Sequence, residues 1–252
     1  MTDKVNVSAG LRSAAEHQEA TRNRGCFEAN PESWEIKIEN FPKYVRRQNL
    51  TRFLSYYEIF KRILTVKGSI VECGVNRGFG ISTWGKLSAI LEPVNLTRRI
   101  YGFDTFSGFP SLSVKDVARS TGDLKVGDLA APDFDELVEL IAIHDSTRFL
   151  GHISKTTLIK GDATKTIPSF IDDNPHLLVS LLFLDFDLYE PSKIAIEHFV
   201  PRMPKGAIIA FDELDNPLWP GETQALLDTL KANTLRLERS PFDPYIGFAE
   251  IG

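Results

Sequence analysis

The stretch Leu177-Leu-Val-Ser-Leu-Leu-Phe-Leu-Asp-Phe-Asp-Leu-Tyr-Glu-Pro-Ser192 decides the fold. Its first half, residues 177–184, is a continuous apolar run with the length of a buried strand, far too short to cross a bilayer. The run stops abruptly at Asp185. Strands that are apolar on both faces belong to parallel sheets covered by helices on each side, so this stretch predicts an α/β fold.

Other segments of the chain extend the same pattern. Short apolar runs bounded by glycine and acid predict further strands at residues 69–73, 99–103, 157–160 and 207–211. Apolar side chains spaced three and four apart predict a helix over residues 50–64, and crossover helices are expected at 81–91, 191–199 and 221–230. Strands that alternate with helices indicate a parallel sheet with helices on both faces.

The C-terminal end of the chain departs from this alternation. Residues 234–238 and 245–251 are strand-like, and the link Ser240-Pro-Phe-Asp-Pro244 between them is too short for a helical crossover. The two strands must therefore form an antiparallel hairpin. A mostly parallel, Rossmann-like sheet closed by a C-terminal antiparallel hairpin is typical of the class I methyltransferase fold.

The 252 residues are enough for one catalytic domain, expected over residues 32–252. Residues 1–31 are polar with little periodicity, which favours a mobile arm, or a cap that orders over a ligand or partner. Residues 112–155 are too long for a simple loop, so we expect an insertion or lid there, with a helix around 133–143.

Bulk composition restricts the partners. A net charge of -5 and a pI near 5.6 offer no broad cationic field for nucleic acid, so a small-molecule substrate is expected. No apolar segment indicates a signal peptide or a membrane span. Cys26 and Cys73 cannot make a disulfide framework or a clustered zinc site, which favours a reducing cytoplasm.

A glycine-rich turn follows the first strand, in Val71-Glu-Cys-Gly-Val-Asn-Arg-Gly-Phe-Gly-Ile-Ser82. Glycines let the backbone approach a ligand closely at this edge of an open sheet. The spacing Gly-x-x-x-Gly-x-Gly differs from the G-x-G-x-x-G of dinucleotide sites, which disfavours a pyrophosphate cradle. Glu72 would instead suit a positively charged amino-acid end such as that of S-adenosylmethionine. A tight strand-to-helix turn without a ligand is the alternative.

Acids follow the next two strands as well. Asp104 ends the second strand, where an acid commonly accepts hydrogen bonds from a ribose, and Asp162 follows the third, near a possible adenine amine. The alternatives are a loop or capping role for Asp104 and a helix N-cap for Asp162. The residues expected at the cofactor are Glu72, Cys73, Gly74, Gly78, Ser82, Asp104, Thr105, Phe106, Gly108, Gly161, Asp162 and Ala163.

The last two parallel strands also end in acid, at Asp185 and at Asp212 with Glu213. On neighbouring strands about 4.8 Å apart these carboxylates converge, and they would repel one another unless a cation neutralised them. Ligands that are all oxygen favour Mg²⁺ over zinc. Helix capping by Asp185 or Asp187, with Asp212 and Glu213 as ordinary loop acids, is the alternative.

At this point the sequence resembles the macrocin O-methyltransferase family, a group of Mg²⁺-dependent sugar O-methyltransferases from natural-product pathways. The resemblance extends from about residue 44 onward. It rests on Ile70-Val-Glu-Cys-Gly-Val75, Tyr101-Gly-Phe-Asp-Thr-Phe-Ser-Gly-Phe-Pro110, Asp185-Phe-Asp-Leu-Tyr-Glu-Pro-Ser192 and Ala210-Phe-Asp-Glu213.

The resemblance implies methyl transfer from S-adenosylmethionine to a deoxysugar hydroxyl, on a nucleotide sugar or a natural-product glycoside. It implies Mg²⁺ ligands at Asp185, Asp212 and Glu213, although the family usually has aspartate where Glu213 stands. Asp185 is also the implied proton acceptor. Because a metal-bound carboxylate is a weakened base, Asp187 is a second catalytic candidate, and Tyr189 or a lid residue remains open. Together with the polar arm, the resemblance favours a homo-oligomer.

Three other functions remain open from the residues. The acceptor could be a catechol-like phenol or another metal-chelating diol, and the chain could be a nucleotide-binding oxidoreductase or a non-catalytic cofactor-binding module. Arg46, Arg47 and Arg52 could meet an anionic nucleotide group, but a solvated helix face is the commoner explanation for such residues.

Overall fold

The computed structural model describes residues 14–116, 124–131 and 134–252. A seven-stranded sheet in the order β3-β2-β1-β4-β5-β7-β6 lies at its centre. The strands are β1 (Ser69–Cys73), β2 (Ile100–Asp104), β3 (Thr156–Lys160), β4 (Val179–Leu184), β5 (Ile208–Phe211), β6 (Glu238–Arg239) and β7 (Gly247–Glu250). The first five pair in parallel, and β7 pairs antiparallel with both β5 and β6. The predicted α/β fold and its C-terminal hairpin are confirmed.

The hairpin's first strand is the prediction most in error. Residues 232–234 form the 3-10 turn η4 (Ala232–Thr234), and β6 begins only at Glu238. The polar segment after α8 therefore turns before it can extend, and only two residues pair with β7.

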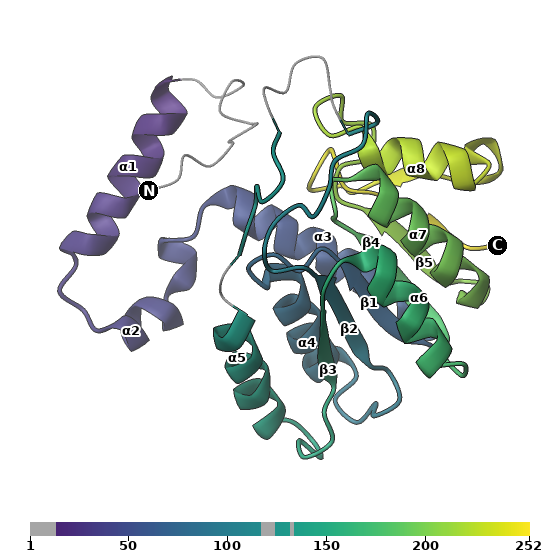
Figure 1. Ribbon diagram of the computed structural model, residues 1–252. Coiled ribbons are helices and arrows are strands. Elements are labelled where there is room, and N and C mark those ends of the chain that lie inside the picture. The colour runs from purple at the N-terminus through teal and green to yellow at the C-terminus, as the bar shows by residue number, and fades with distance from the viewer. Residues whose placement is uncertain (1–13, 117–123, 132–133) are drawn as a thin grey trace.

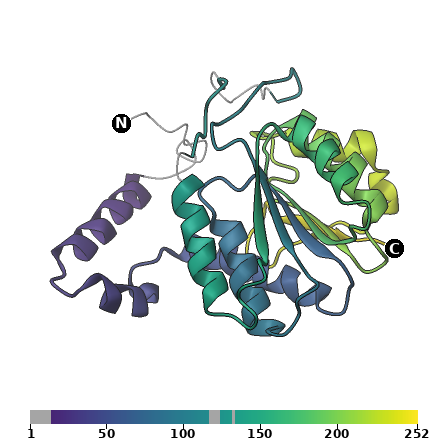
Figure 2. The same cartoon turned by 60° about the horizontal axis from the view of Figure 1, so that its bottom comes forward.

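Helices cover both faces of the sheet, as Figures 1 and 2 show. Those with core residues on one face are α3 (Arg47–Ile63), α4 (Phe79–Leu91) and α5 (Phe134–Ser146). Those on the opposite face are α6 (Ala163–Asp173), α7 (Tyr189–Phe199) and α8 (Gly221–Thr229), with the 3-10 turn η3 (Val200–Arg202) after α7. The crossover helices predicted at 81–91, 191–199 and 221–230 match α4, α7 and α8 to within two residues.

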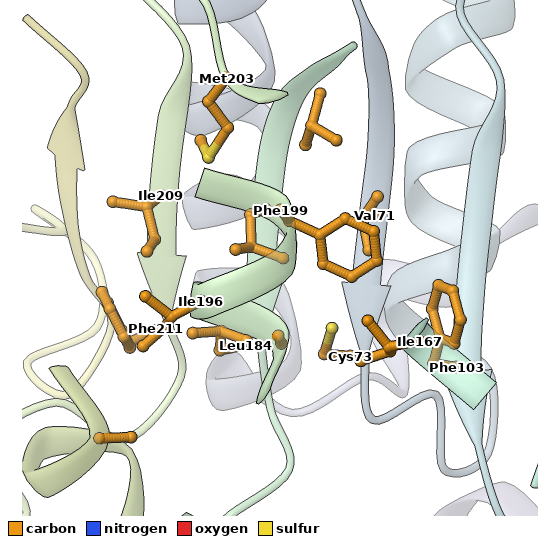
Figure 3. Packing of buried hydrophobic residues seen from close by; sticks show 14 of the residues in the cluster. Val71, Cys73, Phe103, Ile167, Leu184, Ile196, Phe199, Met203, Ile209 and Phe211 are labelled. Atoms are coloured by element: carbon orange, nitrogen blue, oxygen red, sulfur yellow. The ribbon is translucent and has the colours of Figure 1, made fainter. Parts of the chain in front are cut away.

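Strand alternation divides the core into these two layers. On β1, Val71 and Cys73 face α7, as Figure 3 shows, whereas Ile70 packs with the α3 and α4 side. On β4, Leu184 faces α7 and Phe183 faces α3. Because successive side chains on a strand point to opposite faces, the position of a residue relative to the strand end determines which layer its side chain enters.

The N-terminal segment forms helices rather than an irregular arm in its described part. They are α1 (Ala14–Ala29), α2 (Trp34–Glu39) and the 3-10 turn η2 (Phe41–Lys43). Residues 1–13 of the predicted arm lie outside the described residues. The α1 and α2 helices project beside the body of the molecule, and no residue of α2 is buried (Figure 1).

The predicted insertion at 112–155 contains the helix α5, which begins at Phe134. Leu137 of α5 packs into the α3 and α4 layer, so this part of the segment belongs to the core. Residues 117–123 and 132–133 of the insertion lie outside the described residues. Of the helices that the structure describes, none has the length and apolar character to cross a membrane.

Candidate active site

The carboxyl ends of the parallel strands are held in line by backbone hydrogen bonds that continue one residue past each strand. The Gly74 N–H donates to the Phe103 carbonyl at 2.9 Å, and the Asp185 N–H donates to the Cys73 carbonyl at 2.7 Å. The Asp212 N–H donates to the Leu184 carbonyl at 2.9 Å. The side chains that follow β1, β2, β4 and β5 therefore start from one edge of the sheet, as the sequence predicts.

A cavity that opens to solvent runs along this edge, with about 610 Å³ of free space including its open mouth. Its lining comes from the turns after β1 to β4, from the loop after β2 and from the start of α7. The lining residues are Gly74, Asn76, Asp104, Thr105, Gly108, Phe109, Pro110, Leu129, Gly161, Asp162, Ala163, Asp185, Phe186, Asp187, Leu188 and Pro191. Open α/β sheets bind their ligands at this position, beyond the carboxyl ends of the strands.

Seven of the residues predicted at the cofactor line this cavity. They are Gly74, Asp104, Thr105, Gly108, Gly161, Asp162 and Ala163. Among the described residues, the cavity lining does not include the other five, which are Glu72, Cys73, Gly78, Ser82 and Phe106.

The positions of Glu72 and Cys73 follow from strand alternation. Cys73 points into the α7 layer and is fully buried (Figure 3). Glu72 points the other way, beneath the first turn of α4, where a Cβ on Gly80 would collide with its carboxylate. Burial raises the pKa of Glu72 well above its usual range, and Arg52 only partly opposes this. The carboxylate of Glu72 therefore lies against the first turn of α4 and is not among the cavity-lining groups of the described residues.

Three more predicted residues have local structural roles. Gly78 is the N-cap of α4 at a φ of 83°, and a Cβ there would meet Leu137. Ser82 lies half-buried within α4, and Phe106 is buried in the layer of α3 and α4.

Asp104 fixes two of the turns that line the cavity. One carboxylate oxygen accepts the Asn76 N–H at 2.7 Å, and the other accepts the Phe106 N–H at 2.6 Å. Both partners have left-handed backbones, with φ values of 48° and 56°. Such conformations are costly for residues other than glycine, so they need outside support. Asp104 supplies that support while it lines the cavity.

Asp162 has the capping role that the sequence left as an alternative. Its side chain accepts the Thr164 N–H at 3.0 Å and caps α6. It also lines the cavity beside Gly161, whose φ is 143°. A capping acid at this point presents the N-terminus of α6 to the cavity.

The acids after β4 and β5 meet on the α3 side of the sheet. Leu184 pairs with Phe211, so Asp185 and Asp212 are adjacent one residue later. A single side chain bridges them: Arg52 of α3 donates to Asp185 Oδ2 at 2.6 Å and to Asp212 Oδ2 at 2.9 Å. Arg52 therefore belongs to the site and not to a solvated helix face, which the sequence favoured.

Glu213 is not among the hydrogen-bond partners of Arg52 in the described residues. It follows Asp212 directly, and its carboxylate accepts a hydrogen bond from the Asn216 side chain. Among the residues that the structure describes, no group of three or more histidine, cysteine, aspartate or glutamate side chains is arranged to hold a metal ion.

The acid cluster is buried and mutually repulsive. Burial raises the pKa of Asp185 well above its usual range, Asp212 raises it further, and Arg52 opposes both. Burial and the charge of Glu213 raise the pKa of Asp187, and burial raises that of Glu213 to about 7. Glu222 of α8 joins the cluster, where its carboxylate accepts the Asp187 N–H at 3.2 Å. These acids therefore attract protons or cations.

An apolar wall closes the cavity on the side of the predicted insertion. Phe109 packs edge-on against Trp219 with ring centroids 6.1 Å apart, and both contact Leu188. The insertion is anchored there by Asp116, a buried acid that accepts the Tyr189 N–H at 2.6 Å at the start of α7. Sequence reasoning missed Asp116 because its partner is 73 residues away.

The comparisons with known proteins agree with this geometry. Residues 71–214 match the model of a methyltransferase domain family. The chain is a methyltransferase of this family. No curated protein sequence matches it.

Two solved structures resemble the methyltransferase over nearly its whole length. One is CalS11, a calicheamicin methyltransferase, with 35% identity and a TM-score of 0.89 over 96% of this chain and 94% of that one. The other is the apo form of CalS11, described as a TDP-rhamnose 3'-O-methyltransferase, with 33% identity and a TM-score of 0.81 over 96% of each chain. They confirm the expected kinship with sugar O-methyltransferases.

A more distant structure supports the fold alone. The O-methyltransferase NovP shares 18% identity with this methyltransferase, with a TM-score of 0.62 over 79% of each chain.

Proposed function

We propose that this methyltransferase transfers a methyl group from S-adenosylmethionine to a hydroxyl of a deoxysugar, carried on a nucleotide or on a natural-product glycoside, with the aid of Mg²⁺. The observation that carries the proposal is the cavity along the sheet edge, whose lining combines the glycine-containing turns after β1, β2 and β3 with Asp185 and Asp187. The similarity to CalS11, whose description names TDP-rhamnose, favours a nucleotide sugar as acceptor.

The donor end is assigned to the turns after β1, β2 and β3. Gly74 and Gly161 have no side chain to occupy the cavity, and Asp104 keeps the turns around it open. S-adenosylmethionine, bound there, would supply an electrophilic methyl group on its sulfonium centre.

The acceptor end is assigned to Asp185 and Asp187. In the transfer, the acceptor oxygen forms a bond to the methyl carbon, the carbon–sulfur bond breaks, and the hydroxyl proton passes to a carboxylate. Asp185 and Asp187 both line the cavity and are the candidates for that proton. Phe109 and Leu188 line the cavity and pack with Trp219 in one apolar cluster, so they offer an apolar surface that would hold the sugar ring in line with the methyl group.

The donor set at the acid end fits a divalent cation in part. Asp185 and Asp212 already share one cationic group, the guanidinium of Arg52. The buried Oδ1 atom of Asp212 has no hydrogen-bond partner among the described residues. These two carboxylates would hold Mg²⁺, with Glu213 as a third ligand if its bond to Asn216 opens. Bound there, Mg²⁺ would acidify the acceptor hydroxyl.

A comparison of acceptors tests the proposed substrate class. Purified protein is incubated with Mg²⁺, methyl-labelled S-adenosylmethionine and either a TDP-deoxysugar, a deoxysugar glycoside or a catechol. Label is expected in the sugars and not in the catechol. Label in the catechol alone would assign the enzyme to phenolic acceptors, and cofactor binding without any labelled acceptor would contradict transfer to both classes.

Asp104→Asn is expected to weaken the binding of S-adenosylhomocysteine by about tenfold to a hundredfold. An amide has one acceptor oxygen, so either the Asn76 or the Phe106 N–H would lose its partner, and hydrogen bonds to charged groups contribute roughly 1.5–3 kcal/mol. Calorimetric titration measures the change, and the exposed Asp173→Asn on α6 is the control. Equal affinities in the two variants would remove Asp104 from the cofactor site.

We also propose that the enzyme is a homo-oligomer joined through its N-terminal helices. Trp34 and Ile38 of α2 are 67% and 60% exposed, and Ile36 and Phe41 beside them are also exposed. The arm projects from the body (Figures 1 and 2), so its apolar side chains can reach a second copy of the chain. The outer face of α5, with Val138 and Ile143, offers a second exposed apolar strip for that copy.

Trp34→Glu is expected to raise the dissociation constant of the oligomer by roughly thirtyfold or more, because buried tryptophans are frequent hot spots of about 2 kcal/mol or more. Size-exclusion chromatography with light scattering across a dilution series measures it. The control is Val94→Glu, an equally exposed apolar residue outside the arm. A monomeric wild-type protein, or equal dissociation of both variants, would contradict the proposed interface.

A further inference from the structure

Arg52 occupies the position where a cation is expected between the two acid-tipped strands. Its guanidinium donates to Asp185 Oδ2, to Asp212 Oδ2 and, at 3.1 Å, to the hydroxyl of Tyr56. One planar group thus joins carboxylates from β4 and β5. A divalent ion that bound these carboxylates would need the same oxygens.

The single positive charge of Arg52 is outnumbered by the carboxylates around it. Asp187, Glu213 and Glu222 lie close enough to influence the two acids that Arg52 bridges. Asp212 is only 6% exposed, and its second oxygen remains without a hydrogen-bond partner among the residues of the described ranges. Buried carboxylate oxygens without a partner are costly, so this oxygen has capacity for a further ligand.

Arg52 is also able to release the carboxylates of Asp185 and Asp212. Its side chain is 31% exposed, whereas those of Asp185 and Asp212 are 21% and 7% exposed, so Arg52 is the most accessible of the three side chains in the bridge. The rings of Tyr56 and Phe79 flank it, with centroids 5.6 and 5.8 Å from the guanidinium carbon. These aromatic faces attract the guanidinium in its bridging position and would continue to do so after it releases the carboxylates, because cation–π attraction does not need the acids.

We propose that Arg52 is an exchangeable counter-cation, which neutralises Asp185 and Asp212 in the metal-free enzyme and releases their oxygens, while staying against the rings of Tyr56 and Phe79, when a divalent cation binds. The inference rests on the proposed metal dependence. It assigns Arg52 a positioning role: the residue keeps the two strand ends together without metal, and it lowers the affinity for metal because each binding event must displace it.

The test compares Mg²⁺ binding by wild-type protein, Arg52→Met and Arg62→Met, without acceptor. Arg62 is a matched control because it lies on the same helix and pairs with a carboxylate, Glu238, away from the cavity. Arg52→Met is expected to bind Mg²⁺ about tenfold more tightly or better than wild type, because no guanidinium has to be displaced. Its metal-free melting temperature should fall by several degrees and rise further on Mg²⁺ addition than that of wild type. Arg62→Met should bind Mg²⁺ as wild type does.

A second measurement needs no substitution that could prevent folding. The ¹⁵N resonance of the Arg52 Nε group, assigned by its absence in Arg52→Lys, should shift as wild-type protein is titrated with Mg²⁺. Arg98 is the internal control, because it is buried and pairs with Glu92. An unchanged Arg52 resonance at saturating Mg²⁺, or equal Mg²⁺ affinity in wild type and Arg52→Met, would overturn the exchange while the metal site stands. If none of the proteins binds Mg²⁺ yet methyl transfer proceeds, both the exchange and the metal dependence are wrong, and the transferase assignment survives.

Discussion

Asp185→Asn is expected to lower kcat by about a thousandfold while the affinity for S-adenosylhomocysteine stays nearly unchanged. Loss of a positioned proton acceptor typically costs 10²–10⁴ in rate. Asp185 lines the cavity and its side chain is held by Arg52 of α3, whereas the residues assigned to the cofactor follow β1, β2 and β3. Steady-state kinetics and calorimetry on the same preparation separate the two effects.

The exposed Asp172→Asn on α6 is the control for this change, because it makes the same replacement far from the cavity. Full turnover in Asp185→Asn would remove Asp185 from both its proposed roles, as proton acceptor and as metal ligand. A large loss of cofactor affinity would instead indicate that Asp185 acts on the donor side.

Gly74→Ala is expected to lower the free energy of unfolding by about 4 kcal/mol or to prevent folding. Gly74 has a φ of 97°, and a Cβ there would fall on the carbonyl oxygen of Asp185, where β1 and β4 end side by side. Both groups are backbone, so neither can yield without moving a strand. Urea unfolding followed by circular dichroism measures the change.

Gly127→Ala is the control that separates the two causes of instability in Gly74→Ala, the steric collision of the new Cβ and the strain of a left-handed backbone. Gly127 has a similar φ of 88°, but no atom lies within 4 Å of the position of its Cβ. Left-handed strain alone costs about 1–2 kcal/mol, so this control should remain folded. If both alanine variants lose the same stability, the close approach of β1 to Asp185 has no particular energetic importance.

The sheet was predictable because its signal is local. The run ending at Leu184 and the strand Ser69–Cys73 are short, mostly apolar and buried on both faces, and their acids mark the carboxyl edge in the sequence itself. The hairpin followed from a link too short for a helix. The register of β4 with β5, which places Asp185 beside Asp212, then needed only the assumption that the strands are neighbours.

The side-chain directions at the site were harder to foresee. Glu72 and Asp104 are both strand-end acids in the sequence, but Glu72 lies one residue before the last residue of β1 and Asp104 is the last residue of β2. That difference places Glu72 under α4 and Asp104 at the cavity.

Arg52 was missed for a different reason. Its partners lie 133 and 160 residues away, and helix periodicity gives no sign of which arginine on a polar face meets them. The packing of α3 across the ends of β4 and β5 decides this, and that packing is a tertiary property.

Methyl transfer to a TDP-deoxysugar by metal-depleted protein, titrated with Mg²⁺, tests the central claim most directly. We expect labelled methyl groups to appear in the sugar as Mg²⁺ is added and transfer to stop when a chelator removes it. Equal methylation with Mg²⁺ and with chelator would contradict the metal-assisted mechanism. Bound S-adenosylmethionine with no label in any sugar at saturating Mg²⁺ would contradict the proposed function itself.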